Sequence, residues 1–247
     1  MKTLLTVLCF TSILIFSNCS GTKALDRAIA NPLSVTKLKI SYTSLKTLPP
    51  EIGKMKNLKS IEIFKTGFEK LPVEIGELEN LETLIISSNK LTSLPASIEN
   101  LKKLKKLSLK HNEIKELPVD FGELTALEEL HLEYNKLENL PPSIGNLKKL
   151  EFLYLNDNQL LEIPNEIGNL TNLRFLVIGK NSLTELPVTL GNLTGLVELD
   201  IARSGPMLTL PESVSNCRRI EYLYIDNTTI LPYSLNTANP RLRIVVK

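Results

Sequence analysis

The amino-acid sequence repeats itself with a period of 23 residues from Val35 onwards, and this repetition constrains the fold more than any other feature. Each unit opens with the pattern Leu-x-x-Leu-x-Leu, and one of them, Leu127 to Lys149, reads LEELHLEYNKLENLPPSIGNLKK. Units begin at Val35, Leu58, Leu81, Leu104, Leu127, Leu150, Leu173 and Leu196, and a shortened ninth begins at Ile220 after one inserted residue. Such a repeat predicts a solenoid in which each unit stacks on its neighbours.

The opening of each unit has the period of a β-strand. Apolar and polar residues alternate through Leu130, His131 and Leu132, so this segment is expected to bury its leucines and expose the residue between them. Stacked units would pair these strands in parallel at about 4.8 Å, while the bulkier return path needs more room. The stack should therefore bend, with the strands and a polar groove on its concave face.

The unit resembles the leucine-rich-repeat family in the variety LxxLxLxxNxLxxLPxxIGxLxx, over about residues 35 to 230. This resemblance implies an α/β fold, namely a right-handed horseshoe solenoid. It would carry a parallel β-sheet on the concave face and short 3-10 or turn segments on the convex face. Binding of a protein partner in the groove is the function that the resemblance implies.

Several positions within the unit have structural explanations. The ninth position is Asn89, Asn112, Asn135, Asn158 and Asn181 in the middle units, which predicts an asparagine ladder that satisfies buried backbone groups. Nine of the 14 prolines follow an equivalent Leu or Ile, which places them on the convex return path. Glycines such as Gly76 and Gly145 are expected to end the return turn, and Cys217 is expected to be a small core residue.

Both ends of the solenoid are expected to carry covers, because end units expose their core. Residues 19–34 are interpreted as a tether and a helical cap, with a short amphipathic helix over Leu25 to Ala30 that stops at Asn31-Pro32. Residues 231–247 are interpreted as a cap strand, in which Leu242, Ile244 and Val246 alternate with other residues. The repeats between these covers form one domain.

Residues 1–18 have the pattern of a signal peptide. Lys2 precedes an apolar run from Leu4 to Phe16 that is too short to span a bilayer. The segment Phe16-Ser17-Asn18-Cys19 resembles a bacterial lipobox, in which the cysteine becomes the acylated first residue, although Phe16 and Asn18 depart from its usual Leu and Gly or Ala. We therefore predict lipidation at Cys19 and a location in the bacterial cell envelope, at the outer membrane or cell surface. The alternative is an ordinary secretory signal cut near residues 22–24, which would leave a periplasmic or secreted protein.

Composition argues against several functional classes. The 29 Lys and Arg residues are balanced by 27 Asp and Glu, which does not favour nucleic-acid binding. No phosphate-binding loop and no catalytic motif is present, so we expect neither a cofactor nor catalysis. Glu129, His131 and Glu133, with His111 on the next unit, are the nearest approach to a metal site. Their spacing of about 6.6 Å along a strand is wide for one ion, and a solvated strand face is the preferred interpretation.

Eight of the eleven aromatic residues after the signal fall on groove positions, which favours a contact surface because tyrosine is enriched in interfaces. They are Tyr42, Phe64, Tyr134, Phe152, Tyr154, Phe175, Tyr222 and Tyr224. Groove charges divide along the chain. Early units carry Lys37, Lys39, Lys65, Lys106 and Lys110, and later ones carry Glu129, Glu133, Asp157, Glu198, Asp200 and Asp226, with Glu62, Lys180 and Arg203 as exceptions. This division is expected to orient a partner.

The predicted function is recognition of a protein partner by the groove of an exported, lipid-anchored repeat protein. The predicted contact residues are Tyr134, Phe152, Tyr154, Phe175, Tyr222, Tyr224, Lys106, Lys110, His131, Glu133 and Asp200. Two alternatives stay open at this point. One is a carbohydrate or small-ligand receptor that uses Tyr134, Tyr154 and Phe175 as stacking platforms, and the other is a self-associating structural envelope protein.

Overall fold

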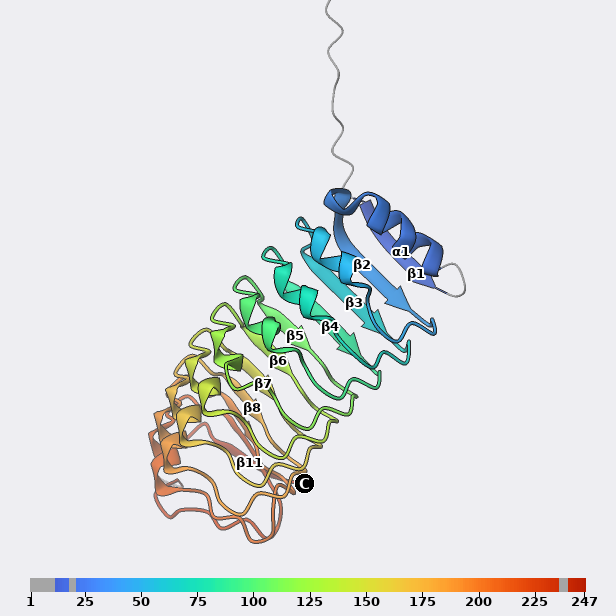
Figure 1. Cartoon of the computed structure of the whole chain (residues 1–247). Helices are drawn as coiled ribbons and strands as arrows, with labels where there is room; N and C mark the ends of the chain where they lie inside the picture. The colour runs from blue at the N-terminus through green and yellow to red at the C-terminus, as the bar shows by residue number, and fades with distance from the viewer. Residues whose placement is uncertain (1–11, 18–20, 236–239) are drawn as a thin grey trace, which may run out of the picture.

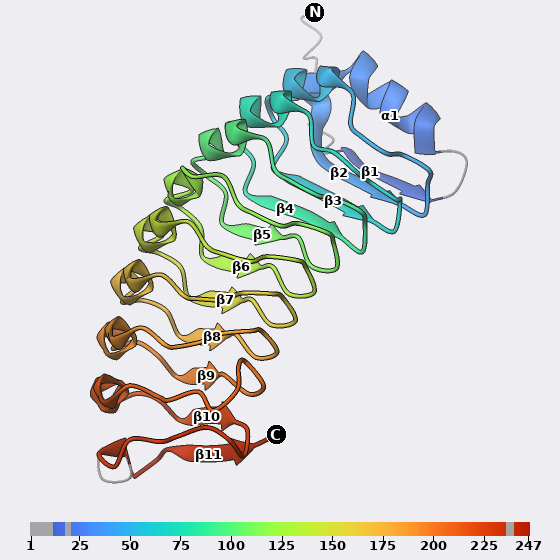
Figure 2. The ribbon, with the colours of Figure 1, turned by 60° about the horizontal axis from the view of Figure 1, so that its bottom comes forward.

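The computed structural model describes residues 12–17, 21–235 and 240–247, which form a curved stack of short, similar coils (Figure 1). Within these residues one sheet of eleven parallel strands runs through the molecule in sequence order. The strands lie side by side along an arc, and the 3-10 turns line up along its outer side (Figure 2). The α/β horseshoe expected from the repeat is confirmed.

The strands alternate with short helical segments along the chain. The strands are β1 (Ser12–Ser17), β2 (Val35–Ser41), β3 (Ser60–Phe64), β4 (Thr83–Ser87), β5 (Lys106–Ser108), β6 (Glu129–His131), β7 (Phe152–Tyr154), β8 (Phe175–Val177), β9 (Glu198–Asp200), β10 (Tyr222–Ile225) and β11 (Arg243–Val246). The helical segments are α1 (Gly21–Ala30) and the 3-10 turns η1 (Pro32–Ser34), η2 (Pro50–Lys54), η3 (Val73–Glu77), η4 (Ala96–Asn100), η5 (Phe121–Glu123), η6 (Pro142–Asn146), η7 (Asn165–Asn169), η8 (Val188–Asn192) and η9 (Glu212–Asn216).

The sequence period is also the register of the sheet. Leu130 pairs with Leu107 on one side and with Leu153 on the other, so equivalent residues of successive units stand next to each other. The register continues through Leu176 and Leu199. Any position on the concave face therefore forms a row that crosses the strands, and the chemistry of a row can be read from the aligned repeats.

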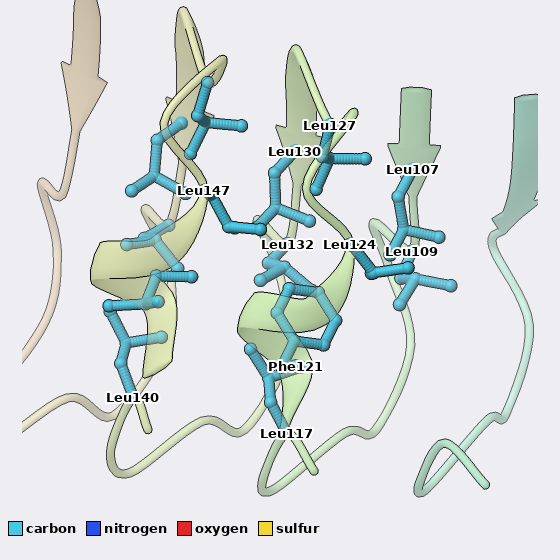
Figure 3. Close-up of a cluster of buried hydrophobic side chains, with 14 of the residues drawn as sticks. Leu107, Leu109, Leu117, Phe121, Leu124, Leu127, Leu130, Leu132, Leu140 and Leu147 are labelled. Carbon is cyan, nitrogen blue, oxygen red and sulfur yellow. The ribbon is translucent and has the colours of Figure 1, made fainter. Parts of the chain in front are cut away.

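The interior is filled by the repeated leucines and isoleucines together with two phenylalanines (Figure 3). Leu130 and Leu132 have no exposed surface, and neither do Phe68 and Phe121. Cys217 is buried to 1% exposure at a core position, as expected. Full burial of each such side chain contributes about 1.5 to 3 kcal/mol, which makes this core the main source of stability.

The asparagine ladder is present in the turns that follow β4 to β8. In the middle unit, Asn135 Nδ2 donates hydrogen bonds to the carbonyls of Leu109 and Leu132, both at 3.0 Å. Asn135 Oδ1 accepts one from the Ile114 amide at 3.1 Å. The same pattern recurs at Asn112, Asn158 and Asn181. These asparagines are structural, because each one satisfies buried backbone groups of two units.

The glycines of the return path differ in their role from the sequence-based expectation. Gly76 lies inside η3, and Gly145 lies inside η6, so neither ends the turn. A Cβ atom on Gly76 would lie 2.4 Å from the carbonyl oxygen of Ser97 in the next unit. Close packing of successive 3-10 turns therefore favours glycine at Gly76, whereas Glu99 in η4 and Ser215 in η9 show that other residues fit the same repeat position. The preceding prolines, such as Pro72, do lie on this path, at the starts of the turns.

The N-terminal end is covered by α1, which contains the expected helix and begins four residues earlier than predicted. Leu25 and Ala28 of α1 are buried against the first units. Beyond α1, the strand β1 pairs in parallel with β2, although it covers the end of the apolar run that the sequence assigns to a signal peptide. An apolar segment of extended residues satisfies the open edge of β2. Cleavage before Cys19 would remove this strand; residues 1–11 and Cys19 itself lie outside the described residues.

The C-terminal end is closed less completely than the sequence suggests. The predicted last strand is present as β11 and pairs in parallel with β10, so the backbone ladder is extended by one strand. Its apolar side chains are not buried, since Ile244 is 37% exposed and Val246 is 61% exposed. The strand therefore caps hydrogen-bonding groups but leaves an apolar edge.

Candidate functional site

The centre of the concave face carries aromatic rings that stack from strand to strand. Phe152 on β7 and Phe175 on β8 are register partners, and their ring centroids lie 5.0 Å apart at 12°. Tyr154 stacks in the same way on His131 of β6, at 4.6 Å and 12°. These four side chains are partly exposed. The predicted aromatic cluster is therefore contiguous, because the parallel register brings equivalent positions together.

We call the surface formed by His131, Phe152, Tyr154 and Phe175 the aromatic floor. The residues that follow the strands have unusual backbone geometry, and we call them the rim. The eighth residue of each of the eight full units has a positive φ between 49° and 59°. These residues are Tyr42, Lys65, Ser88, His111, Tyr134, Asp157, Lys180 and Arg203. Such a conformation costs about 1 to 3 kcal/mol for a residue other than glycine, and only Asp157 is of a type that tolerates it. The hydrogen bonds of the neighbouring ladder hold the turn in this conformation. Because these positions lack glycine, the sequence does not predict a positive φ there.

A hollow of about 280 Å³ lies beside these rim residues on the concave face. Its wall includes Tyr134, Asp157 and Lys180 from the rim and Val177 from β8. Tyr134 stacks on His111 with ring centroids 4.2 Å apart, and Lys180 Nζ lies 3.0 Å from Asp157 Oδ1. The hollow thus combines an aromatic wall with an internal ion pair, and Val177 in its wall lies on β8, the strand that begins with Phe175.

The tyrosines predicted nearer the C-terminus are covered by cations. Tyr222 and Tyr224 lie on β10 with ring centroids 6.3 Å apart. The Lys247 ammonium sits 3.9 Å from the centroid of Tyr224, and the Arg243 guanidinium lies 5.9 Å from that of Tyr222. Both tyrosines therefore lie against cations at the C-terminal end of the chain, and their role as groove contacts stays a prediction.

Asp200 is likewise not the exposed steering charge that the sequence suggested. It is only 9% exposed, and its Oδ2 lies 2.6 Å from Lys247 Nζ. Its Oδ1 accepts a hydrogen bond from the Ala202 amide at 3.0 Å. Lys247 reaches Asp200 because β11 pairs in parallel with β10. The sequence does not specify the register of this last strand, so it does not predict the ion pair.

The early lysines of the groove are largely paired with acidic residues of the next strand. Lys106 forms an ion pair with Glu129. Lys37 and Lys39 share Glu62 at 2.7 and 3.1 Å, and the same contacts lower the pKa of Glu62 against the opposing effect of burial, which is the largest influence. Lys110 is exposed. The charge division predicted from the sequence is thus partly neutralised by contacts between strands.

His131 lies between two carboxylates, that of Glu129 on the same strand and that of Glu133 just after the end of β6. Its Nε2 is 3.6 Å from Glu129 Oε2, and its Nδ1 is 3.7 Å from Glu133 Oε1. The side chains lean towards each other, so they lie closer than the spacing of alternate strand residues suggested. Among the described residues, no group of three or more His, Cys, Asp or Glu has the arrangement of a metal site. Glu133 Oε2 is buried without a hydrogen-bond partner in the described structure.

Glu198 on β9 was not among the predicted contact residues, yet it borders the aromatic floor as the register partner of Phe175. Burial raises the pKa of its carboxyl, the nearby Asp200 raises it further, and Lys247 opposes both. Burial also raises the pKa of the Tyr154 phenol, with additional contributions from Glu198, Glu133 and Glu129. The register of β6 to β9 thus brings these carboxylates within electrostatic range of Tyr154.

Comparison with known proteins places the chain among repeat proteins. The family model described as "Leucine-rich repeat region" matches residues 3–112 and 96–173. Among curated proteins, none matches the chain. A leucine-rich-repeat protein of Leptospira interrogans is 28% identical with a TM-score of 0.53, over 90% of this chain and 75% of that one.

Two further solved structures are similar. The leucine-rich repeat domain of the type III effector XopL is 25% identical with a TM-score of 0.74, over 91% of this chain and 80% of that one. A plant peptide hormone receptor, RGFR1 in complex with RGF2, is 25% identical with a TM-score of 0.68, over 83% of this chain and 39% of that one. The chain thus spans most of the Leptospira protein and of the XopL repeat domain, and less than half of the plant receptor.

Proposed function

The chain belongs to the leucine-rich-repeat family, and we propose on that premise that it is a non-catalytic module that binds a protein partner on its concave face. The observation that carries this proposal is the stack of Phe152 and Phe175 beside Tyr154, which is partly exposed on two adjacent strands, β7 and β8, of an open sheet. Aromatic side chains in such positions commonly dominate interface energies. The similar plant peptide hormone receptor, whose structure contains RGF2, supports a polypeptide ligand for this chain.

The geometry of the floor suits a polypeptide. Three strands at about 4.8 Å spacing give it a width of about 10 Å across β6 to β8, which matches one extended segment or one face of a helix. The rings present apolar area, while Tyr154 keeps a hydroxyl for a hydrogen bond. A partner that covers these rings would exclude water from the half-buried carboxylates around them, which adds specificity.

The proposal is tested by comparing substitutions on the two faces. Tyr154→Ala and Phe175→Ala should each weaken binding about thirtyfold, from the loss of about 2 kcal/mol at a central aromatic contact. Lys102→Ala and Glu166→Ala, on the convex side, should leave affinity within about twofold. Surface plasmon resonance on folded variants, with a partner isolated by its affinity for the wild-type chain, measures both. If the convex substitutions abolish binding and the aromatic ones do not, the concave face is not the site.

The predicted charge substitutions need a different choice of residue. Lys106→Glu would break the ion pair with Glu129, and Asp200→Lys would place a cation against Lys247. Both changes would perturb the folded face as well as the encounter with a partner. Lys110→Glu is the cleaner test of electrostatic steering, because this side chain is exposed. It should mainly change the association rate and its salt dependence.

Export and lipid anchoring at Cys19 form the second part of the proposal, and they rest on the signal-like residues 1–18 and the lipobox-like segment before Cys19. Among the described residues, no helix has the length and apolar character needed to cross a membrane. Metabolic labelling with a fatty-acid analogue, followed by intact-mass measurement, tests the anchor. Label on the wild type that is lost in Cys19→Ser is the expected result; equal labelling of the two proteins, or none, contradicts it.

The mass measurement also decides the fate of β1. A mature chain that starts at Cys19 lacks this strand, so β2 becomes the edge of the sheet. An uncleaved chain keeps β1 in the sheet. Backbone amides of β2 that exchange quickly in the mature chain and slowly in the uncleaved chain would show that β1 protects this edge.

A further inference from the structure

The acidic side chains of the concave face differ in whether they have a cation of their own. Four of them have a lysine partner, namely Glu62, Glu129, Asp157 and Asp200. Asp226 accepts hydrogen bonds from Thr228 and Thr229. In the described part of the chain, Glu133 and Glu198 have no lysine or arginine nitrogen within 4.0 Å. These two carboxylates are the unbalanced charges of the surface.

Both unbalanced carboxylates lie partly withdrawn from water beside the aromatic floor. The Glu133 side chain is 13% exposed, and its Oε2 is buried without a hydrogen-bond partner. Glu198 is next to Phe175 in the register, and its charge acts on the Tyr154 hydroxyl together with that of Glu133. A desolvated carboxylate without a counter-ion is unfavourable, and an incoming cationic donor relieves this penalty.

The two carboxylates flank the floor on opposite sides. Glu133 follows β6 and Glu198 begins β9, so three strand spacings of about 4.8 Å separate them across the sheet, about 14 Å. Four residues along the strand direction add a component of about 13 Å. The Cα atoms of the two residues are therefore about 20 Å apart, and Tyr154 on β7 lies between them. An extended polypeptide at about 3.3 Å per residue covers this distance in about six residues.

We propose that the bound protein segment is basic, with two lysine or arginine side chains about six residues apart that contact Glu133 and Glu198, and apolar residues between them that pack on Phe175 and Tyr154. This inference rests on the proposed function and specifies the chemistry of the partner. Arginine suits the Glu198 side in particular, because a planar guanidinium can lie against the Phe175 ring while it donates to a carboxylate. The Arg174 guanidinium already lies 5.9 Å from the centroid of that ring, so an incoming arginine would share the ring with it.

The test uses three fluorescent nine-residue peptides and the folded chain. The matching probe is SRSFSFSRS, whose arginines are six residues apart. The charge control is SESFSFSES, and the spacing control SRRFSFSSS carries adjacent arginines. Fluorescence anisotropy at low ionic strength should give the tightest binding for the matching probe, and this preference should weaken as salt is added.

Charge-removing substitutions then assign the contacts. Glu133→Gln and Glu198→Gln should each weaken binding of the matching probe about three- to tenfold. Neither substitution should lower the affinity for the acidic probe below that of the wild type. Glu166→Gln, on the convex η7, removes the same charge and should have no effect. Glu198→Lys should improve binding of the acidic probe. Circular dichroism and urea midpoints verify that each variant is folded.

The outcomes separate this inference from the proposed function. If the acidic probe binds wild type as tightly as the matching probe, or if Glu166→Gln weakens binding as much as Glu198→Gln, the inference is wrong. If Phe175→Ala weakens all three probes alike while the glutamine variants change nothing, the concave face binds polypeptides without the proposed cation contacts. If the full partner binds the aromatic variants as tightly as the wild type, the proposed function is wrong, and this inference is wrong with it.

Discussion

Replacement of Asn135 by leucine removes the central rung of the ladder while it nearly preserves side-chain volume. Asn135 is 8% exposed and makes hydrogen bonds to the backbone of two units. The Ile114 amide has Asn135 Oδ1 as its acceptor at 3.1 Å, so Asn135→Leu leaves a buried donor unpaired. An unsatisfied buried group of this kind costs about 1 to 3 kcal/mol.

The two carbonyls that Asn135 serves lose less, because each is shared with a neighbouring rung. The Leu109 carbonyl also accepts from Asn112 at 2.8 Å, and the Leu132 carbonyl also accepts from Asn158 at 2.9 Å. Each lost bond then contributes about 0.5 to 1 kcal/mol, and burial of the leucine offsets about 1 kcal/mol. We expect a net loss of about 1 to 4 kcal/mol.

Urea unfolding followed by far-UV circular dichroism measures this loss. With a denaturant dependence of about 2 to 3 kcal/mol per molar, the midpoint should fall by about 1 M. Hydrogen exchange should show that the Ile114 amide loses protection. Lys136→Leu introduces the same leucine at the exposed neighbouring position and should leave the midpoint unchanged. An unchanged midpoint for Asn135→Leu with a protected Ile114 amide would refute the ladder argument.

Three further predictions concern a carboxyl, a thiol and two glycines. Burial raises the pKa of Glu198 above its ordinary value of 4.5, so its ionisation destabilises the folded chain; Glu198→Gln should therefore raise the urea midpoint at pH 7, and this gain should disappear as the pH falls below 4.5. Burial raises the pKa of Cys217 to about 11, so a thiol reagent at pH 8 should label it, as located by mass spectrometry, only after unfolding; rapid labelling of the folded chain would contradict its place in the core. A Cβ atom on Gly205 would lie 1.9 Å from a backbone carbonyl oxygen of the preceding unit, whereas at Gly67 only a φ of +74° opposes alanine, at a cost of about 1 kcal/mol. Gly205→Ala should therefore lower the thermal midpoint more than Gly67→Ala does. Equal shifts for the two glycine variants would show that the close contact relaxes freely.

The repeat allowed much of the site to be predicted, because its period is also the register of the sheet. Phe152 and Phe175 occupy the same position in consecutive units, and this alone places their rings together. The same reasoning identified the ladder through Asn135 and the buried position of Cys217. In a solenoid the contacts between units are short-range along the stack, so aligned repeats contain most of the information about neighbours.

The remaining features depend on contacts that the repeat does not encode. Lys247 covers Tyr224 and pairs with Asp200 because the irregular C-terminal segment adds its strand in parallel, and no aligned unit specifies that register. The left-handed rim at positions such as Tyr134 is imposed by the hydrogen-bonded ladder against the local preference of the residue.

The sequence by itself thus determined the solenoid, its core and the rows of the concave face, since each follows from a local pattern repeated along one axis. Only the tertiary structure decided which charges of that face are neutralised and which are not. That outcome depends on which long side chains reach a carboxylate on another strand, as Lys106 reaches Glu129 and Lys247 reaches Asp200, and such distances are properties of the packed molecule.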